Sequence, residues 1–363
     1  MSQSQGYRKG RGATDNVTGR FEEQTAQLTD DGWDTLANEF EQQAETSLPT
    51  RVSDEIARTI ISHNQSPDVP FQQSVNPYRG CEHGCVYCFA RPSHSYLGLS
   101  PGLDFETKIL AKRNAAELLA REIAKPSYRP LPIALGINTD GYQPTERRLH
   151  ITRECLQVLH DANHPLSIVT KSALVTRDLD LLAPMAAKGL AHVFISVTTL
   201  DNRLSAKLEP RAAAPHTRLK TIRTLTEAGI PTGVLVAPVI PMLTDMELDH
   251  ILQACAEHGA HAAGYVLLRL PHELKEVWRG WLETHYPERA EHIVSLMKQM
   301  HGGKEYDSAH HTRMKGQGPF ADLIRLRFAK AKQRFGLASN LAPLNASLFT
   351  APLPQSPQPD LFR

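Results

Sequence analysis

Short, unbroken runs of apolar residues recur through the middle of the chain, and apolar and polar positions do not alternate within them. Such runs are typical of strands that are covered on both faces, as in a parallel sheet. They occupy residues 133–137, 166–170, 193–197, 233–239 and 265–268. We expect a further strand at residues 71–78, just ahead of a segment that is rich in cysteine.

Amphipathic segments of helical length separate these runs. In the longest, residues 104–124, the apolar residues from Phe105 to Ile123 fall near one stripe, which predicts a single helix. Gly229 and Pro231 are typical of a helix that ends at residue 228. Further helices are expected at residues 147–159, 177–188, 217–228 and 245–257.

The order of these elements predicts an α/β fold. A strand about every 30 residues, each followed by a helix, gives six βα units. Because a complete barrel has eight units, we expect a partial (β/α)6 TIM-type barrel, with functional groups just after the strands.

The two ends of the chain depart from this pattern. The first residues are polar and include the basic residues Arg8, Lys9, Arg11 and Arg20, which predicts a solvated tail, and one helix is expected around residues 33–44. Residues 320–334 predict a basic amphipathic helix, and the Pro-rich residues that follow predict disorder. We therefore expect a partly disordered extension at residues 1–70, a core domain at 71–300, a helical extension at 301–342 and a disordered tail at 343–363.

Composition and charge add a few limits. The 40 Lys and Arg against 39 Asp and Glu give a net charge of +1, so no global field draws the protein to nucleic acid or to a membrane, although a local basic groove is compatible with it. The polar N-terminus lacks the apolar stretch of a signal peptide, and no run approaches the ~18 apolar residues of a membrane span. Five cysteines in 363 residues are typical of a reducing compartment, so we expect a cytoplasmic protein.

Three of the five cysteines lie together, with the spacing CxxxCxxC, at Cys81, Cys85 and Cys88. Structural zinc usually takes four protein ligands from two separate hooks, and the remaining cysteines, Cys155 and Cys255, stand alone in helical patterns. Three thiolates suit an iron–sulfur cube with one iron open to an outside ligand. A zinc site completed by His83 or His94, and a disulfide with a spare thiol, are the alternatives.

The cysteine triplet, with Tyr87 before its last member, resembles the signature of the radical S-adenosylmethionine (SAM) superfamily. The resemblance covers roughly residues 70–270 and implies that Cys81, Cys85 and Cys88 hold a 4Fe-4S cluster. It implies that SAM binds the open iron and is cleaved to a 5′-deoxyadenosyl radical. Such an enzyme needs an electron donor, for example flavodoxin or ferredoxin.

The segment after the second strand of the barrel is Asn138-Thr-Asp-Gly-Tyr-Gln-Pro-Thr-Glu146. Its position matches the superfamily motif that binds the SAM ammonium group, so the resemblance assigns Thr139 and Asp140 to that role. A turn that caps the next helix through Thr145 and Glu146 is the structural alternative.

Other SAM contacts are expected after the third and fourth strands. Lys171 ends the third strand, where burial of its ammonium group is costly unless the group meets an anion. The SAM carboxylate is a suitable partner, and the Thr-Lys-Ser sequence around Lys171 is similar to that of the photoproduct-lyase branch. Ser196 and Arg211 complete the ribose and carboxylate contacts that the resemblance implies.

Short sequence motifs of this chain resemble those of one branch of the superfamily, the DNA repair photolyase group, whose members are relatives of spore photoproduct lyase. The resemblance rests on Asn76-Pro-Tyr-Arg-Gly-Cys81, Phe105-Glu-Thr-Lys-Ile109 and Asp140-Gly-Tyr-Gln-Pro-Thr-Glu146. The lyase carries a hydrogen-donating Cys two positions before the Asp of its second-strand motif, and this chain has Asn138 there. That difference argues against reversal of thymine dimers by the same route.

Two functional classes therefore stay open. One is a radical SAM lyase or repair-type enzyme that acts on damaged nucleic acid, and the other is a radical SAM enzyme that modifies a peptide, cofactor or metabolite. A third possibility is an iron–sulfur redox protein or structural metal protein. It is disfavoured because such a protein has no SAM for Asp140, Lys171 and Ser196 to bind.

The end of the chain, Gln358-Pro-Asp-Leu-Phe362, resembles the pentapeptide by which bacterial repair and replication proteins bind the sliding clamp. In this interpretation Leu361 and Phe362 enter an apolar pocket, while Gln358 and Asp360 fix the register. Pro359 departs from the usual Leu, and a tail without a partner is the alternative.

Overall fold

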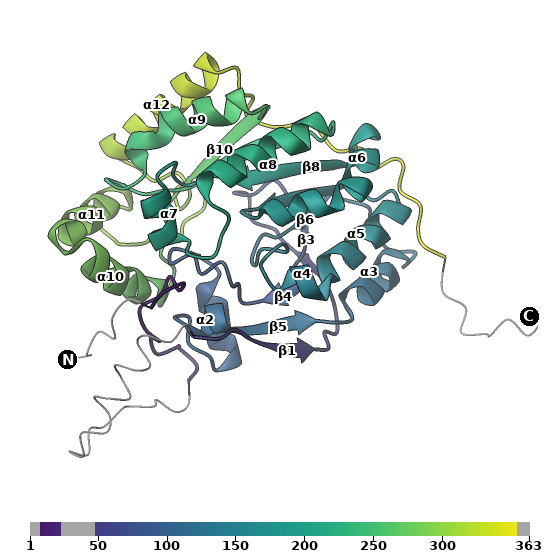
Figure 1. The fold of residues 1–363 in the computed structure, drawn as a ribbon, viewed down its shortest axis with the longest axis horizontal. Helices are drawn as coiled ribbons and strands as arrows, with labels where there is room; N and C mark the ends of the chain where they lie inside the picture. Colours follow the sequence, from purple (N-terminus) through teal and green to yellow (C-terminus); the bar gives the residue numbers. More distant parts are fainter. Residues whose placement is uncertain (1–7, 23–47, 354–363) are drawn as a thin grey trace, which may run out of the picture.

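The computed structural model describes residues 8–22 and 48–353, and a sheet of seven strands forms its centre (Figure 1). The strand order is β10-β9-β8-β7-β6-β3-β2. The six strands β3, β6, β7, β8, β9 and β10 are parallel, and β2 is antiparallel to β3 at one edge. No pair joins the edge strands β2 and β10 within the described residues, as expected of a partial barrel. The strands are β2 (Ile61–His63), β3 (Gln73–Val75), β6 (Ile133–Leu135), β7 (Leu166–Thr170), β8 (Ala191–Ser196), β9 (Thr232–Val239) and β10 (Ala262–Leu267).

Helices follow these strands and cover the outer face of the sheet (Figure 1). Each buries one apolar stripe, and the six predicted βα units are confirmed. The helix expected to end at residue 228 ends at Glu227, with Ala228 as its C-cap, and Gly229 adopts a left-handed φ of 76° directly after the cap. The helices are α3 (Ala115–Ile123), α4 (Glu146–Leu149), α5 (Ile151–Asp161), α6 (Leu179–Ala187), α7 (Asn202–Leu208), α8 (Pro215–Glu227) and α9 (Leu248–Glu257), with short 3-10 helices η2 (Ala173–Asp178) and η3 (Asp245–Glu247).

The single helix predicted at residues 104–124 is wrong. The segment forms α2 (Asp104–Thr107), then β5 (Lys108–Lys112), and only then α3. In β5 the buried residues Ile109 and Ala111 alternate with more exposed ones, so apolar residues that also fit a helical stripe instead follow the period of two of a strand. β5 pairs with β1 (Arg51–Glu55) and β4 (Tyr78–Arg79) in a second, three-stranded sheet.

The C-terminal part adds three helices after β10. The predicted basic helix is α12 (Pro319–Arg334), and it is preceded by α10 (Leu274–His285) and α11 (Pro287–Met300), which the sequence pattern did not reveal. The N–H of Leu267 donates to the carbonyl of Met314 at 2.9 Å, and Ala263 donates to Ala338 at 2.9 Å. These bonds cover the outer edge of β10, which would otherwise be an exposed strand edge. Within the described part of the chain, no helix is both long and apolar enough to span a membrane.

The basic start of the chain is not a solvated tail. Arg11 is buried, and its Nη1 donates to the carbonyl of Glu106 at 3.0 Å. The N–H groups of Gly12 and Ala13 donate to the Glu106 carboxylate at 3.0 and 2.8 Å. A buried carboxylate needs such donors, and this requirement fixes the N-terminal segment on the core. The helix predicted at residues 33–44 lies outside the described residues.

The disorder predicted from residue 343 is wrong as far as residue 353. Asn345 N–H donates to Gly189 O at 2.8 Å, and Thr350 N–H donates to Ala162 O at 2.9 Å. The Phe349 ring packs against Tyr128 and His164, with ring centroids 5.8 and 5.3 Å apart. Since Ala162 and Gly189 precede β7 and β8, the segment crosses the N-terminal ends of the strands. The clamp-like motif at residues 358–362 lies outside the described residues.

Candidate metal and SAM site

Cys81, Cys85 and Cys88 lie on one loop, residues 80–90, which joins β4 to the 3-10 helix η1 (Arg91–Leu97); we call it the cysteine loop. Gly80 and Gly84 bend it with left-handed φ angles of 77° and 67°. A Cβ at Gly84 would lie 2.7 Å from Glu106 Oε2, so only glycine fits there. The loop leaves β4 at the C-terminal edge of the neighbouring parallel strands, where such folds place their sites.

The environment of the thiols fits a metal-bound state. Burial raises the pKa of Cys81 and of Cys85; Asp140 and the other two thiols add to the shift of Cys81, and Glu209 and the Cys88 thiol add to that of Cys85. Buried thiolates this close together need a compensating cation, and bound metal ions supply one. Within residues 8–22 and 48–353, however, no group of three or more His, Cys, Asp or Glu side chains is arranged to hold a metal ion, so the ligand assignment stays a prediction.

The histidines of the zinc alternative are engaged elsewhere. His83 Nδ1 lies 3.3 Å from Asp140 Oδ2. His94 Nε2 lies 3.0 Å from the carbonyl of Lys108, and its ring meets Phe105 edge-on. These contacts do not favour a fourth ligand from either ring.

Asp140, on the loop after β6, connects three segments at the carboxyl ends of the strands. Its carboxylate accepts from the Thr170 hydroxyl at 2.7 Å, from Lys171 N–H at 2.8 Å and from Tyr142 N–H at 2.9 Å. Burial alone would raise its pKa, but the charge and hydrogen bond of His83, with the bonds from Lys171 and Thr170, lower the pKa to about 2. Asp140 is therefore a fixed negative charge beside the cysteine loop.

Two neighbours of Asp140 also hold the loops in place. Thr139 is buried, and its hydroxyl donates to the carbonyl of Tyr78 at 2.8 Å. The buried amide of Gln143 accepts from Glu82 N–H at 2.9 Å and donates to Gly80 O at 3.2 Å. Gln143 thus fixes the backbone on both sides of the first cysteine, a role that the sequence analysis missed.

Lys171 follows β7 and lies beside the cysteine loop. Its Nζ lies 5.8 Å from the centroid of the Tyr87 ring, and its charge acts to lower the pKa of Cys85. Its ammonium group has no ion pair or hydrogen bond within the described residues. A half-buried ammonium without an anionic partner is typical of a site that receives an anion.

The structure brings Ser196 and Arg211 to the same edge of the sheet. Ser196 is the last residue of β8 and is buried, and its carbonyl accepts from Arg218 Nη1 at 3.1 Å. Arg211 N–H donates to His83 O at 3.2 Å, and its guanidinium pairs with Glu82 at 3.2 Å. Asp140, Lys171 and Arg211 therefore contact the cysteine loop, whereas Thr139 contacts β4 and Ser196 ends β8, and the contacts of all five with SAM stay predictions.

Comparisons with known proteins agree with this arrangement. The sequence model of the Radical SAM superfamily matches residues 75–255. The uncharacterized protein Rv2578c of Mycobacterium tuberculosis is 35% identical over 294 residues, covering 77% of this chain and 83% of that protein. This chain belongs to the radical SAM superfamily. The uncharacterized protein MJ0683 of Methanocaldococcus jannaschii is 28% identical over 219 residues, 60% of this chain and 78% of that protein.

Solved structures share the fold of this radical SAM protein. Spore photoproduct lyase complexed with dinucleoside spore photoproduct aligns with a TM-score of 0.58 and 16% identity, over 79% of this chain and 81% of that one. A mutant of the same lyase, with bound AdoMet and dinucleoside spore photoproduct, aligns with a TM-score of 0.56 and 14% identity, over 85% and 94%. At these identities the likeness establishes the fold.

A buried ion pair supports Tyr87 of the cysteine loop from the β8 side. The carboxylate of Glu209 pairs with Arg218 and accepts from the hydroxyls of Tyr87 and Thr198. Sequence analysis missed this group because Tyr87 and Glu209 are 122 residues apart and meet only in the folded chain.

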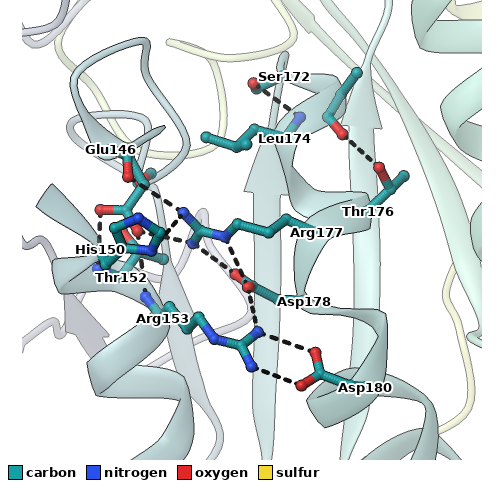
Figure 2. Close-up of polar contacts among 12 residues, drawn as sticks. Glu146, His150, Thr152, Arg153, Ser172, Leu174, Thr176, Arg177, Asp178 and Asp180 are labelled. Carbon is teal, nitrogen blue, oxygen red and sulfur yellow. Dashed lines mark hydrogen bonds and ion pairs between the residues drawn. The ribbon is translucent and has the colours of Figure 1, made fainter. Parts of the chain in front are cut away.

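A second buried network, centred on Glu146, stabilises the end of the loop after β6 (Figure 2). Glu146 accepts from Arg177 Nη2 at 2.8 Å, from Thr152 N–H at 3.0 Å and from the Tyr78 hydroxyl. Thr145 is the N-cap residue of α4 but makes no side-chain capping bond, whereas the Glu146 carboxylate accepts from the N–H groups of Thr152 and Arg153 at the start of α5, so the helix-capping alternative holds for Glu146. In Figure 2 the network continues to the α6 side through Asp178, Arg153 and Asp180.

Arg269 and Phe89 form a pair beside the cysteine loop that the sequence did not reveal. Phe89 follows Cys88 directly, and the guanidinium carbon of Arg269 lies 4.7 Å from the centroid of its ring. Burial lowers the pKa of Arg269. Within the described residues its guanidinium has no hydrogen bond or ion pair, so its N–H donors are available to a ligand.

Proposed function

We propose that this radical SAM enzyme binds a 4Fe-4S cluster through Cys81, Cys85 and Cys88 and takes its electron from a donor such as flavodoxin or ferredoxin. The chemistry such a cluster supplies is reductive cleavage of SAM to a 5′-deoxyadenosyl radical, which abstracts hydrogen from the substrate. The observation that carries the proposal is a loop with three thiols, two buried and one half-buried, held by Gln143, Asp140 and Glu209 at the carboxyl ends of parallel strands. A reducing, cytoplasmic location fits these thiols.

The residues around the loop suit the polar groups of SAM. Lys171 offers an unpaired ammonium to the carboxylate, and Thr139 and Asp140 place acceptor oxygens and a negative charge where the resemblance expects the SAM ammonium. Ser196 and Arg211 would reach the ribose and the carboxylate. The role of each of these side chains is to bind and orient SAM.

For the substrate we propose damaged nucleic acid, in a reaction of the photoproduct-lyase type. Arg269 supports an anionic substrate, because a partly buried guanidinium without a carboxylate partner is suited to a phosphate. The shared fold with spore photoproduct lyase points the same way. With Asn138 in place of a hydrogen-donating Cys, any hydrogen donor must be another group. Modification of a peptide, cofactor or metabolite is the alternative.

Release of 5′-deoxyadenosine tests this proposal. Anaerobically reconstituted protein, with SAM and a one-electron reductant, is incubated with ultraviolet-damaged DNA, undamaged DNA or no DNA. We expect release above the DNA-free rate only with damaged DNA, and a lower rate for Arg269→Met. Equal release in all three samples would favour the peptide, cofactor or metabolite class, and no release would leave only the redox or structural protein.

A second partner is proposed for the tail. Gln358, Asp360, Leu361 and Phe362 would bind the sliding clamp and bring the enzyme to DNA. The anchoring of residues 345–350 supports this idea, because the tail then starts from a fixed point at the N-terminal ends of the strands.

A further inference from the structure

A tight turn at residues 19–22 projects two side chains from the N-terminal segment. The N–H of Gly19 donates to Glu22 Oε1 at 2.9 Å, and the N–H of Glu22 donates to Gly19 O at 3.2 Å. Arg20 and Phe21 occupy the middle of this turn. The turn therefore presents a cation and an aromatic ring together.

The turn is fixed to the core by one buried carboxylate. Both N–H and Nε of Arg20 donate to Glu273 Oε1, at 3.0 and 2.7 Å. The hydroxyl of Ser95, on η1, donates to the same oxygen at 3.3 Å. Three segments therefore meet here: the N-terminal turn, the 3-10 helix after the cysteine loop and the start of α10.

The aromatic side chains at this junction are exposed. Phe21 and Tyr96 expose 52% and 69% of their surfaces, although their rings stack with centroids 5.1 Å apart and an angle of 29°. The guanidinium carbon of Arg20 lies 5.4 Å from one ring and 5.7 Å from the other. We call Arg20, Phe21 and Tyr96 the aromatic platform. It is held in place before any ligand arrives.

A surface hollow of about 400 Å³ continues from the platform. It starts at His272, whose Nδ1 lies 3.1 Å from Arg20 Nη1. Three cations line it, against two carboxylates: Lys275, Arg279 and Lys298, with Glu276 and Glu305. Arg279 pairs with Glu305 and Lys298 Nζ lies 3.6 Å from the same carboxylate, so Lys275 supplies the charge that no ion pair within the described residues balances. Aromatic faces beside a surplus of positive charge suit a ligand that carries both flat rings and anionic groups.

We propose that the aromatic platform stacks an unpaired base of single-stranded nucleic acid, while the cations of the hollow contact its phosphates. An apolar protein partner is less suited, because it would bury Arg20 and three further cations. The inference rests on the proposed nucleic-acid substrate and names where the strand lies beyond the reacting nucleotide. Tyr96 lies on η1, which begins two residues after Phe89, and the five steps from Arg91 to Tyr96 span about 10 Å along the helix, so the platform is a few nucleotides from Arg269.

Oligonucleotide binding tests the platform separately from catalysis. The anaerobically reconstituted full chain is titrated, without reductant, into fluorescently labelled oligothymidylate and oligouridylate of about eight nucleotides. We expect Tyr96→Ala and Phe21→Ala each to weaken binding about ten-fold or more, and Tyr96→Phe to bind like the wild type. Leu323→Ala, which removes a side chain that is 50% exposed on α12, is the matched control and should bind normally.

The possible outcomes separate the two proposals. If the wild type binds the oligonucleotides but the platform variants bind equally well, the platform inference is wrong and the proposed substrate class is unaffected. Absence of binding to either oligonucleotide would also overturn the platform. The proposed substrate class is judged by DNA-dependent release of 5′-deoxyadenosine, which a platform variant should still show with a damaged dinucleotide.

Discussion

Individual residues at the site could be predicted only where their chemistry is local. The spacing of the three cysteines and the place of Lys171 after a strand are visible in the sequence, and the structure puts them at one edge of the sheet. The partners of His83 and Arg211 are not visible. The contacts His83–Asp140 and Arg211–Glu82 join loops that are 57 and 129 residues apart, and only the tertiary fold brings them together.

Lys171→Ala should weaken SAM binding and leave the metal content unchanged. The variant removes a cation but no metal ligand, and a charge-assisted contact contributes ~1.5–3 kcal/mol, roughly ten- to a hundred-fold in affinity. Equilibrium dialysis of reconstituted protein against labelled SAM measures the effect, with Lys188→Ala, a lysine after α6, as the control. Wild-type affinity in Lys171→Ala would show that this ammonium does not contact SAM.

At the scale of elements, strands with a pure apolar run were predictable and strands with mixed sequence were not. β7 begins and ends at the predicted residues. A strand that is covered on both faces is largely apolar along its length, so its bounds can be seen in the sequence. β5 was hidden, because Ile109 and Ala111 fit both a helical stripe and an alternating strand. Pairing with β1, 57 residues earlier in the chain, decides between the two.

The network in Figure 2 joins α4, α5 and α6, and its loss should lower stability. Arg177→Met leaves the buried Glu146 carboxylate without its cation, which typically costs ~3–5 kcal/mol. We expect the thermal midpoint of the variant to fall by several degrees. Glu146→Gln combined with Arg177→Met removes the unpaired charge and should recover part of the loss. Equal midpoints for the wild type and Arg177→Met would mean that the ion pair adds no net stability.

At the scale of the molecule, the sequence predicted the partial barrel but not how the chain ends attach to it. Arg11 and Phe349 lie in segments whose composition predicts solvated or disordered chain, yet both segments bind the core. Arg11 donates to the backbone carbonyl of Glu106 and Phe349 packs on the His164 and Tyr128 rings, and composition does not record such specific contacts. The division into four segments stays a prediction.

Removal of residues 358–363 should leave folding, metal content and SAM cleavage unchanged and abolish binding to the sliding clamp. Leu361→Ala with Phe362→Ala should do the same, because these side chains supply the apolar contact. A labelled peptide of residues 350–363 should bind purified clamp with a Kd around micromolar, since ordering entropy opposes its few contacts. No saturable binding below about a hundred micromolar would refute the clamp proposal.

The central claim, that Cys81, Cys85 and Cys88 hold a 4Fe-4S cluster which cleaves SAM, is tested most directly by metal analysis of anaerobic protein together with 5′-deoxyadenosine release. The wild type should contain about four iron and four sulfide per chain and release 5′-deoxyadenosine. Cys81→Ala, Cys85→Ala and Cys88→Ala should each lose the iron and the release. Cys155→Ala, which changes a buried thiol of α5, should retain both. One equivalent of zinc with no iron in the anaerobic wild type would contradict the account.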